Sequence, residues 1–331
     1  MRNPIVDFSA HAVVSMAVIF VHGLFALVNA QEGLALARKA AQDNRKTVEA
    51  IQSLSCKSEI SVIDANGKTH PSQKEIKSGK YWASGNTVRF AADSPADARW
   101  ECLETDGVRT YLSTRKGPSG EPVISGTISK AINLICFGAD IERRCLLRFE
   151  NRKPSLSATP ANKKTLLLEE LFDEGWREFK ECRSVADGTV LIVFDVMKKY
   201  QHEIVVDPRR NHLVTKYSVV PYTIDRQTPL TSNSEIKEFE EVQKGLFFPK
   251  RISEVLYVNG KREKEETTTL SQIVVNDPGV VQNLKIDFPP NTLVTDNLRN
   301  KRARVRADGS LEDVGSIAIT PKRTNPQRHD P

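Results

Sequence analysis

Short β-rich runs joined by two-residue turn signals recur along most of this chain. Asp106-Gly107 separates the run Trp100–Leu103 from Val108–Tyr111, and Asn259-Gly260 separates two longer runs near the C-terminus. Both dipeptides favour the tight positive-φ turn that joins neighbouring antiparallel strands. Because each such turn pairs a strand with the next one in sequence, this pattern constrains the fold to an antiparallel meander.

Further segments have the same strand-like composition. They lie near residues 57–64, 74–82, 86–91, 99–105 and 108–113, and again at 189–194, 203–206, 213–219, 249–258 and 265–275. Before them, apolar residues of Glu32–Leu54 recur at three- and four-residue steps, which predicts one amphipathic helix. Ile128–Phe137 and Thr165–Phe172 also favour helix, so residues 128–175 are expected to form a helical insert.

The order of these elements predicts the fold class. We expect an α+β chain, mainly antiparallel β, whose strands form one curved half-open β-barrel. The N-terminal helix and the helical insert would cover its concave side. The predicted domain spans residues 31–300 and is followed by a C-terminal tail.

Residues 1–30 have the organisation of a secretory signal peptide. Arg2 lies in a short polar start, Ala12–Leu27 is an apolar run, and Val28-Asn29-Ala30 offers small residues before the expected cleavage site. The mature chain would begin at Gln31, so no cysteine is there to carry a lipid. We expect a periplasmic or secreted protein. An uncleaved N-terminal membrane anchor is the alternative.

The net charge of +6 is mild, and the densest basic cluster lies near the C-terminus. Its members are Arg299, Lys301, Arg302, Arg304 and Arg306. We interpret residues 301–331 as a basic, partly disordered tail suited to contact with an anionic membrane surface. Nucleic acid is not an expected partner, because no aromatic residues interleave the basic ones and export conflicts with that role.

The cysteine count is odd. The five are Cys56, Cys102, Cys136, Cys145 and Cys182. At least one is therefore unpaired within the chain. No pair has the C-x-x-C spacing of a redox or zinc site. Cys136 and Cys145 are close enough in sequence for a local bridge, and buried thiols are the alternative.

Catalytic signatures are sparse. Ser113–Lys116 fits the S-x-x-K pattern but lies where a strand enters a turn, whereas that motif works from a helix. The acidic residues Glu169, Glu170, Asp173 and Glu174 would give a hydrolase an acid pair, or else form a solvated helix face. No enzymatic activity and no cofactor are expected.

His202 and His212 flank a predicted turn and raise the question of a metal site. If Val206 pairs with His212, then His202 lies opposite Lys216, and a cation is a poor neighbour for a metal. We therefore expect no metal site.

A curved sheet covered on one side by helices has a concave apolar face that can hold a hydrophobic ligand. Core packing is the alternative role for each residue there. The candidate lining residues are Phe90, Trp100, Tyr111, Ile192, Phe194, Val205, Tyr217, Ile252, Val255 and Tyr257.

Three segments carry a family resemblance. The first helix runs directly into a strand through Ser55-Cys56-Lys57, Gly245–Lys250 introduces a long late strand, and Leu284–Thr292 has a Phe-Pro-Pro ending. Over about residues 32–296, this order resembles the LolA/LolB-like periplasmic lipoprotein-carrier fold. The resemblance implies a half-open barrel whose mouth, shielded by helices, shelters acyl chains.

Together these features predict an exported, non-enzymatic protein that binds a lipid, a lipoprotein acyl chain or another hydrophobic ligand. The first alternative is an envelope sensor or structural module that binds a protein partner on the same fold. The second is a secreted hydrolase with paired carboxylates.

Overall fold

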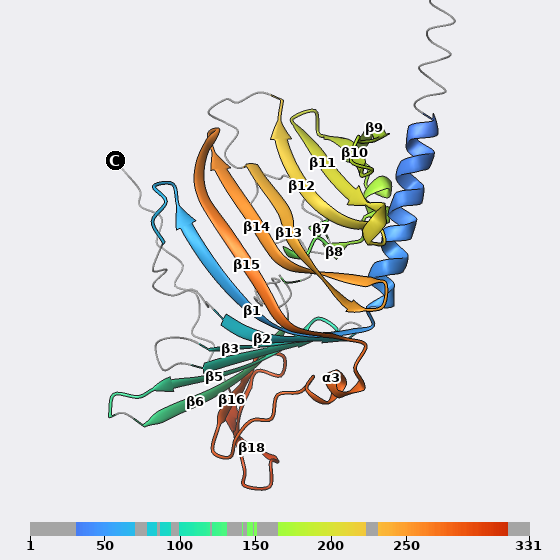
Figure 1. Ribbon diagram of the computed structural model, residues 1–331. Helices are drawn as coiled ribbons and strands as arrows, with labels where there is room; N and C mark the ends of the chain where they lie inside the picture. Colours follow the sequence, from blue (N-terminus) through green and yellow to red (C-terminus); the bar gives the residue numbers. More distant parts are fainter. Residues whose placement is uncertain are drawn as a thin grey trace, which may run out of the picture.

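The computed structural model describes residues 31–69, 78–84, 87–93, 99–119, 121–130, 141, 144–147, 149–150, 165–222 and 231–316. The predicted export signal at residues 1–30 lies outside this set. Within it, sixteen strands form one large, strongly curved sheet (Figure 1). The predicted fold class is confirmed in this respect: the sheet is open, mainly antiparallel and accompanied by an N-terminal helix.

The first meander supplies six consecutive strands. They are β1 (Ser53–Asp64), β2 (Ser78–Ser84), β3 (Thr87–Asp93), β4 (Arg99–Thr105), β5 (Val108–Lys116) and β6 (Pro122–Lys130). Each pairs antiparallel with the next. The predicted Asp106-Gly107 turn is confirmed, because both residues have positive φ, 48° and 77°.

The second meander supplies seven strands. They are β9 (Arg177–Ser184), β10 (Val190–Val196), β11 (Tyr200–Asp207), β12 (Leu213–Pro221), β13 (Thr231–Gln243), β14 (Leu246–Val258) and β15 (Lys261–Val275). The predicted turn at Asn259-Gly260 joins β14 to β15, with φ of 51° and 73°. The antiparallel pairing of β1 with β15 joins the two meanders into one sheet.

The sheet continues where a basic tail was expected. β16 (Leu293–Asp296) pairs parallel with β6, and β17 (Lys301–Val305) and β18 (Leu311–Ser316) follow antiparallel. The arginines of this segment alternate with small or apolar residues, of which Val305 is buried. That period-two alternation is a strand signal, which the cluster of positive charge concealed.

Residues 31–50 form the predicted N-terminal helix, which crosses the ends of the second meander (Figure 1). Its small buried residues, among them Ala37 and Ala41, allow close contact with the core. It ends earlier than the predicted Leu54, because Ser53 already pairs in β1. The Asn276 side chain closes this end, accepting from Gln52 N (2.8 Å) and donating to the Ala50 carbonyl (2.8 Å).

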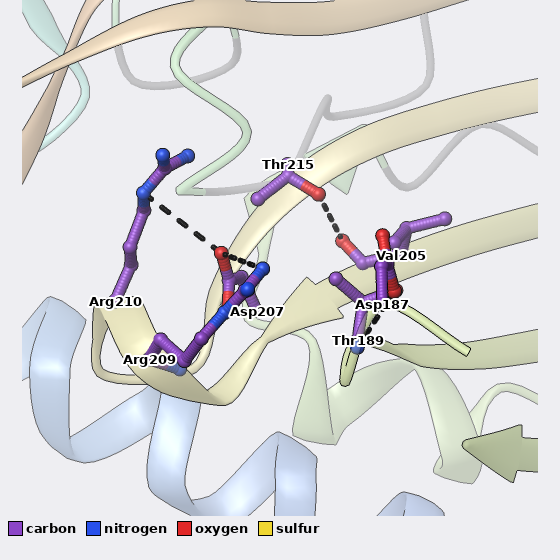
Figure 2. A network of polar contacts seen from close by, with 7 residues as sticks. All are labelled: Asp187, Thr189, Val205, Asp207, Arg209, Arg210 and Thr215. Carbon is purple, nitrogen blue, oxygen red and sulfur yellow. Dashed lines mark hydrogen bonds and ion pairs between the residues drawn. The ribbon is translucent and has the colours of Figure 1, made fainter. Parts of the chain in front are cut away.

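The turn between β11 and β12 holds the helix in place (Figure 2). The buried Asp207 carboxylate accepts from the backbone N–H and the guanidinium of Arg209, both at 3.0 Å, which fixes the short 3-10 helix η2 (Pro208–Arg210). The next backbone carbonyls, those of Asn211 and His212, accept hydrogen bonds from side chains of the N-terminal helix. Asn44 Nδ2 donates to His212 O (2.8 Å), and Thr47 Oγ1 donates to Asn211 O (2.6 Å).

The insert differs from its prediction. Ile128–Lys130 belongs to β6, while residues 131–140 lie outside the described residues. The predicted helix at Thr165–Phe172 is wrong. The chain there forms β8 (Thr165–Leu166), paired with β7 (Phe149–Glu150), and then the 3-10 helix η1 (Glu169–Asp173). Three successive buried leucines start this stretch, and an α-helix would direct consecutive side chains to different sides.

Candidate ligand-binding surfaces of the sheet

Strand register divides the side chains of the second meander between two faces. Ile192, Ile204 and Tyr217 lie opposite one another on β10, β11 and β12, so they share the side that we call the concave face. The short strands β7 and β8 lie within the curve on this side (Figure 1). The opposite side, which carries Leu191, Val205 and Lys216, is the outer face.

Seven of the ten predicted lining residues lie on the concave face. They are Phe90, Trp100, Tyr111, Ile192, Phe194, Tyr217 and Ile252. The assignment of Val205, Val255 and Tyr257 to this face was wrong. Val205 pairs with Lys216, Val255 with Asn233 and Tyr257 with Thr231, all on the outer face. Both faces of these strands carry apolar residues, so composition did not reveal the phase of the alternation.

The concave face is filled by the insert. Nine insert residues are buried in the same core cluster as Ile192 and Phe194: Ile141, Cys145, Leu146, Leu147, Phe149, Leu166, Leu167, Leu168 and Leu171. Aromatic rings complete the contact. Phe149 meets Tyr217 edge-on at 5.5 Å between ring centroids, and Phe172 meets Phe194 at 5.0 Å. Side chains of the chain itself therefore occupy this apolar surface.

A buried ion pair joins the insert to the sheet. Arg144 forms an ion pair with Glu266, and its guanidinium also donates to Thr268 Oγ1 at 3.2 Å. Both charged side chains of the pair are nearly buried, with 10% and 11% of their surface exposed. Neither residue was singled out from the sequence, because they lie 122 positions apart. Breaking a buried pair leaves a charge without its partner in a poorly solvated place.

The acidic cluster of the insert is engaged in local structure. Glu169 pairs with Arg45 of the N-terminal helix at 3.1 Å. Glu170 accepts from Leu167 N at 2.7 Å, and Glu174 accepts from Trp176 Nε1 at 3.0 Å. These carboxylates therefore have structural partners of the kind that close a short helix or a turn.

The predicted pairing around the histidines was wrong. β12 carries an extra residue, Thr215, whose hydroxyl donates to Val205 O at 3.3 Å (Figure 2). Val206 already pairs with Val214 instead of His212, and the extra residue shifts the register by one more position, so His202 lies opposite Val219 instead of Lys216. The part of the chain that the structure describes contains no group of three or more side chains placed to hold a metal ion.

His202 lies instead on the concave face, where it is only partly exposed. Its Nδ1 and the Tyr217 hydroxyl are hydrogen-bonded at 2.9 Å. Burial, with a smaller contribution from the nearby Arg177 guanidinium, lowers the pKa of His202 to about 3. The imidazole therefore stays uncharged at neutral pH, as its apolar surroundings require.

The cysteines divide into two kinds. Cys102 is disulfide-bonded, and Cys136 lies outside the described residues. Cys56, Cys145 and Cys182 are thiols, so the local bridge considered between Cys136 and Cys145 is wrong. Burial raises the pKa of Cys56 to about 12 and that of Cys182 to about 11. Neither is a ready nucleophile, because the thiolate is the reactive form.

A cavity of about 340 Å³ opens beside β12 and β13, largely on the outer face. It is lined by Glu203, Lys216, Ser218, Val219, Val220, Thr231, Ser232, Asn233, Tyr257 and Gly260. Tyr257 is the only predicted lining residue that borders it. The sequence did not indicate this cavity, because it arises where two strands separate.

Comparisons with known proteins yield structural likeness alone. No family profile matches the chain. No curated protein sequence matches it either. The fold is similar to a DUF1329 family protein from Desulfovibrio piger, with 10% identity over 74% of this chain and 93% of that one, at a TM-score of 0.36.

Two other solved structures have a similar fold. One is a putative outer membrane lipoprotein-sorting protein domain from Vibrio parahaemolyticus, with 11% identity over 77% of this chain and 99% of that one, at a TM-score of 0.36. The other is a LolA superfamily protein from Nitrosomonas europaea, with 13% identity over 75% of this chain and 98% of that one, at a TM-score of 0.37. Likeness at this level does not transfer a ligand to this chain.

Among the described residues, no helix has both the length and the apolar character needed to cross a membrane.

Proposed function

We propose that the concave face binds a hydrophobic ligand, an acyl chain of a lipid or lipoprotein being the leading class, in an exported protein without enzymatic activity. One observation carries this proposal. The apolar concave face is covered by one local insert, described at residues 141, 144–147, 149–150 and 165–172, whose strands in this part of the chain form only the short pair β7–β8. Such a cover can leave without dismantling the sixteen-stranded sheet.

Burial of apolar surface favours an exchange in which an acyl chain replaces the insert on the concave face. The insert leucines remove apolar surface from water at about 25 cal/mol per Å². An acyl chain that takes their place buries the same sheet residues, so the concave face does not become exposed to water. The ligand has then to compensate only for release of the insert, and its affinity depends on how firmly the insert is held.

The anchor of the insert gives the experiment. Glu266→Gln removes the charge that pairs with Arg144, and also with Lys264 on the same strand at 3.5 Å, and keeps the shape of the side chain. We expect the dissociation constant of a neutral apolar dye, N-phenyl-1-naphthylamine, to fall by at least about threefold, because the covered state is weakened. Dye fluorescence measured in a titration reports this constant.

Asp313→Asn is the matched control, because it removes one carboxylate from the exposed Lys301–Asp313 pair on β17 and β18. Dye affinity in this variant should equal that of the unmodified protein. Equal affinity in the Glu266→Gln variant would count against a displaceable insert.

A second measurement does not depend on the stability of any variant. Hydrogen exchange of the amides in residues 165–171 is followed by mass spectrometry with and without palmitate. If palmitate replaces the insert, exchange in this segment accelerates while β10 and β11 remain protected. Slower or unchanged exchange in the presence of bound palmitate would overturn the proposal.

A further inference from the structure

The cavity beside β12 and β13 exists because these two strands pair over a very short length. Only three pairs join them in the described residues: Lys216 with Glu235, Tyr217 with Ser234, and Ser218 with Asn233. β12 nevertheless continues to Pro221, and β13 begins at Thr231. Past Ser218 the strands separate, and the cavity occupies the space between them.

The polar lining of this cavity favours an anion. Lys216 forms no ion pair among the described residues. Glu235, which lies opposite it in the register, is paired with Lys237 at 2.5 Å instead. Ser218 Oγ donates to Asn233 Oδ1 at 2.9 Å, so the amide nitrogen of Asn233 is left to donate elsewhere.

One carboxylate also borders the cavity. Glu203 lies opposite Ser218 on the outer face, diagonal to Lys216. Its Oε1 accepts from Gln201 Nε2 at 2.9 Å, which occupies part of its accepting capacity. The lining therefore offers an uncommitted cation and an amide donor, with one partly engaged anion that opposes binding of a second negative charge.

Apart from Thr231, Ser232 and Gly260, the rest of the lining is apolar. Val219, Val220 and the Tyr257 side chain border the space, and Val220 is 41% exposed. Two further exposed hydrophobic residues, Met197 and Tyr222, lie at the same end of β10–β12, where Tyr222 N donates to Lys199 O at 3.1 Å. An exposed apolar surface beside a polar pocket is typical of a site for an amphipathic molecule.

We propose that this cavity binds a small amphipathic carboxylate, whose anionic head lies beside Lys216 and Asn233 and whose short apolar chain lies against Val220 and Tyr257. The volume of about 340 Å³ is near the lower limit for ligand sites, which suits one short chain. The site is separate from the concave face and does not depend on the function proposed for it.

Octanoate is the probe, and octanol is its uncharged counterpart. We expect octanoate to shift the backbone amide resonances of Val219, Val220 and Thr231 in two-dimensional NMR of the whole chain, and octanol to bind more weakly. Lys216→Gln should weaken octanoate binding about tenfold, the effect of losing one charge-assisted contact. Lys216→Arg should retain most of the affinity.

Glu203→Gln is a stricter test, because its expected effect on octanoate affinity is opposite to that of Lys216→Gln. Removing the opposing carboxylate should tighten octanoate binding. If the true ligand were a zwitterion held by both charges, this variant would weaken binding, and the proposal would fall. Lys301→Gln, which removes an equal charge on β17, is the control and should leave the affinity unchanged.

Two further results would overturn the inference. One is octanol binding as tightly as octanoate, and the other is amide shifts confined to concave-face residues. The Glu266→Gln variant separates the two proposals. It should alter dye binding under the insert and leave octanoate binding between β12 and β13 as it was.

Discussion

The two faces of the same strands differ more than their sequences do. On β11, Ile204 and Val205 are adjacent β-branched residues, yet Ile204 is fully buried on the concave face and Val205 is half-buried on the outer face. The insert covers one face, and the other faces the cavity. The burial of these two residues therefore depends on which face the insert covers, and not on the hydrophobicity of each residue.

The outer face itself is not uniform. Over the first meander it is covered by α3 (Pro278–Gln282) and the residues that follow (Figure 1). Arg89 donates to Asn283 O at 2.7 Å, and the Phe288 ring lies against Gly126 of β6. The outer cavity lies on the second meander, beside β12 and β13.

The largest expected effect tests the difference between the faces directly. Leu168 is fully buried in the insert. Leu168→Ala should lower the free energy of unfolding by about 2–5 kcal/mol, because the substitution leaves a cavity in a packed core. Val205→Ala on the outer face should cost less than about 1.5 kcal/mol. Urea unfolding measures both changes. Equal losses would mean that the insert contributes little to the core.

The second prediction concerns pH, and it applies to the concave face only. His202 has a folded pKa of about 3 against an ordinary value of 6.5, so the unfolded chain takes up a proton first as the pH falls. Stability should therefore decline by about 1.4 kcal/mol per pH unit below pH 6.5 because of this residue. His202→Phe should remove that part of the slope.

The measurement is the denaturation midpoint in urea at pH 7 and pH 5 for both proteins. His202→Phe also loses the hydrogen bond to Tyr217, so only the change with pH is informative. If both proteins lose the same stability between the two pH values, His202 is not buried in its neutral form.

The smallest effect tests the covered part of the outer face. A methyl group added at Gly126 would lie 2.5 Å from Phe288 Cε1, closer than carbon atoms approach. Gly126→Ala should therefore cost about 1–3 kcal/mol, because the ring or its segment must move. Gly175→Ala is the control, since nothing lies within 4 Å of the added carbon there. Thermal unfolding that is unchanged in both variants would show that Phe288 does not pack on β6.

How far the sequence predicted the fold depended on the range of the interactions involved. The turns at Asp106-Gly107 and Asn259-Gly260 were predictable because positive φ is a property of two residues. The insert was not, because Leu166, Leu167 and Leu168 favour helix locally and are buried in the core that the insert forms with the sheet. For the candidate site, seven concave residues were found by their apolar character, and three were assigned to the wrong face.

The sequence by itself determined the N-terminal helix, several of the strands and the hairpin turns, since these rest on preferences between neighbouring residues. Tertiary structure decided the rest. It set which face the insert covers, the extra residue at Thr215, the Arg144–Glu266 pair and the separation of β12 from β13. These features depend on contacts between residues far apart in the chain, and a local pattern does not specify which distant segment supplies the contact.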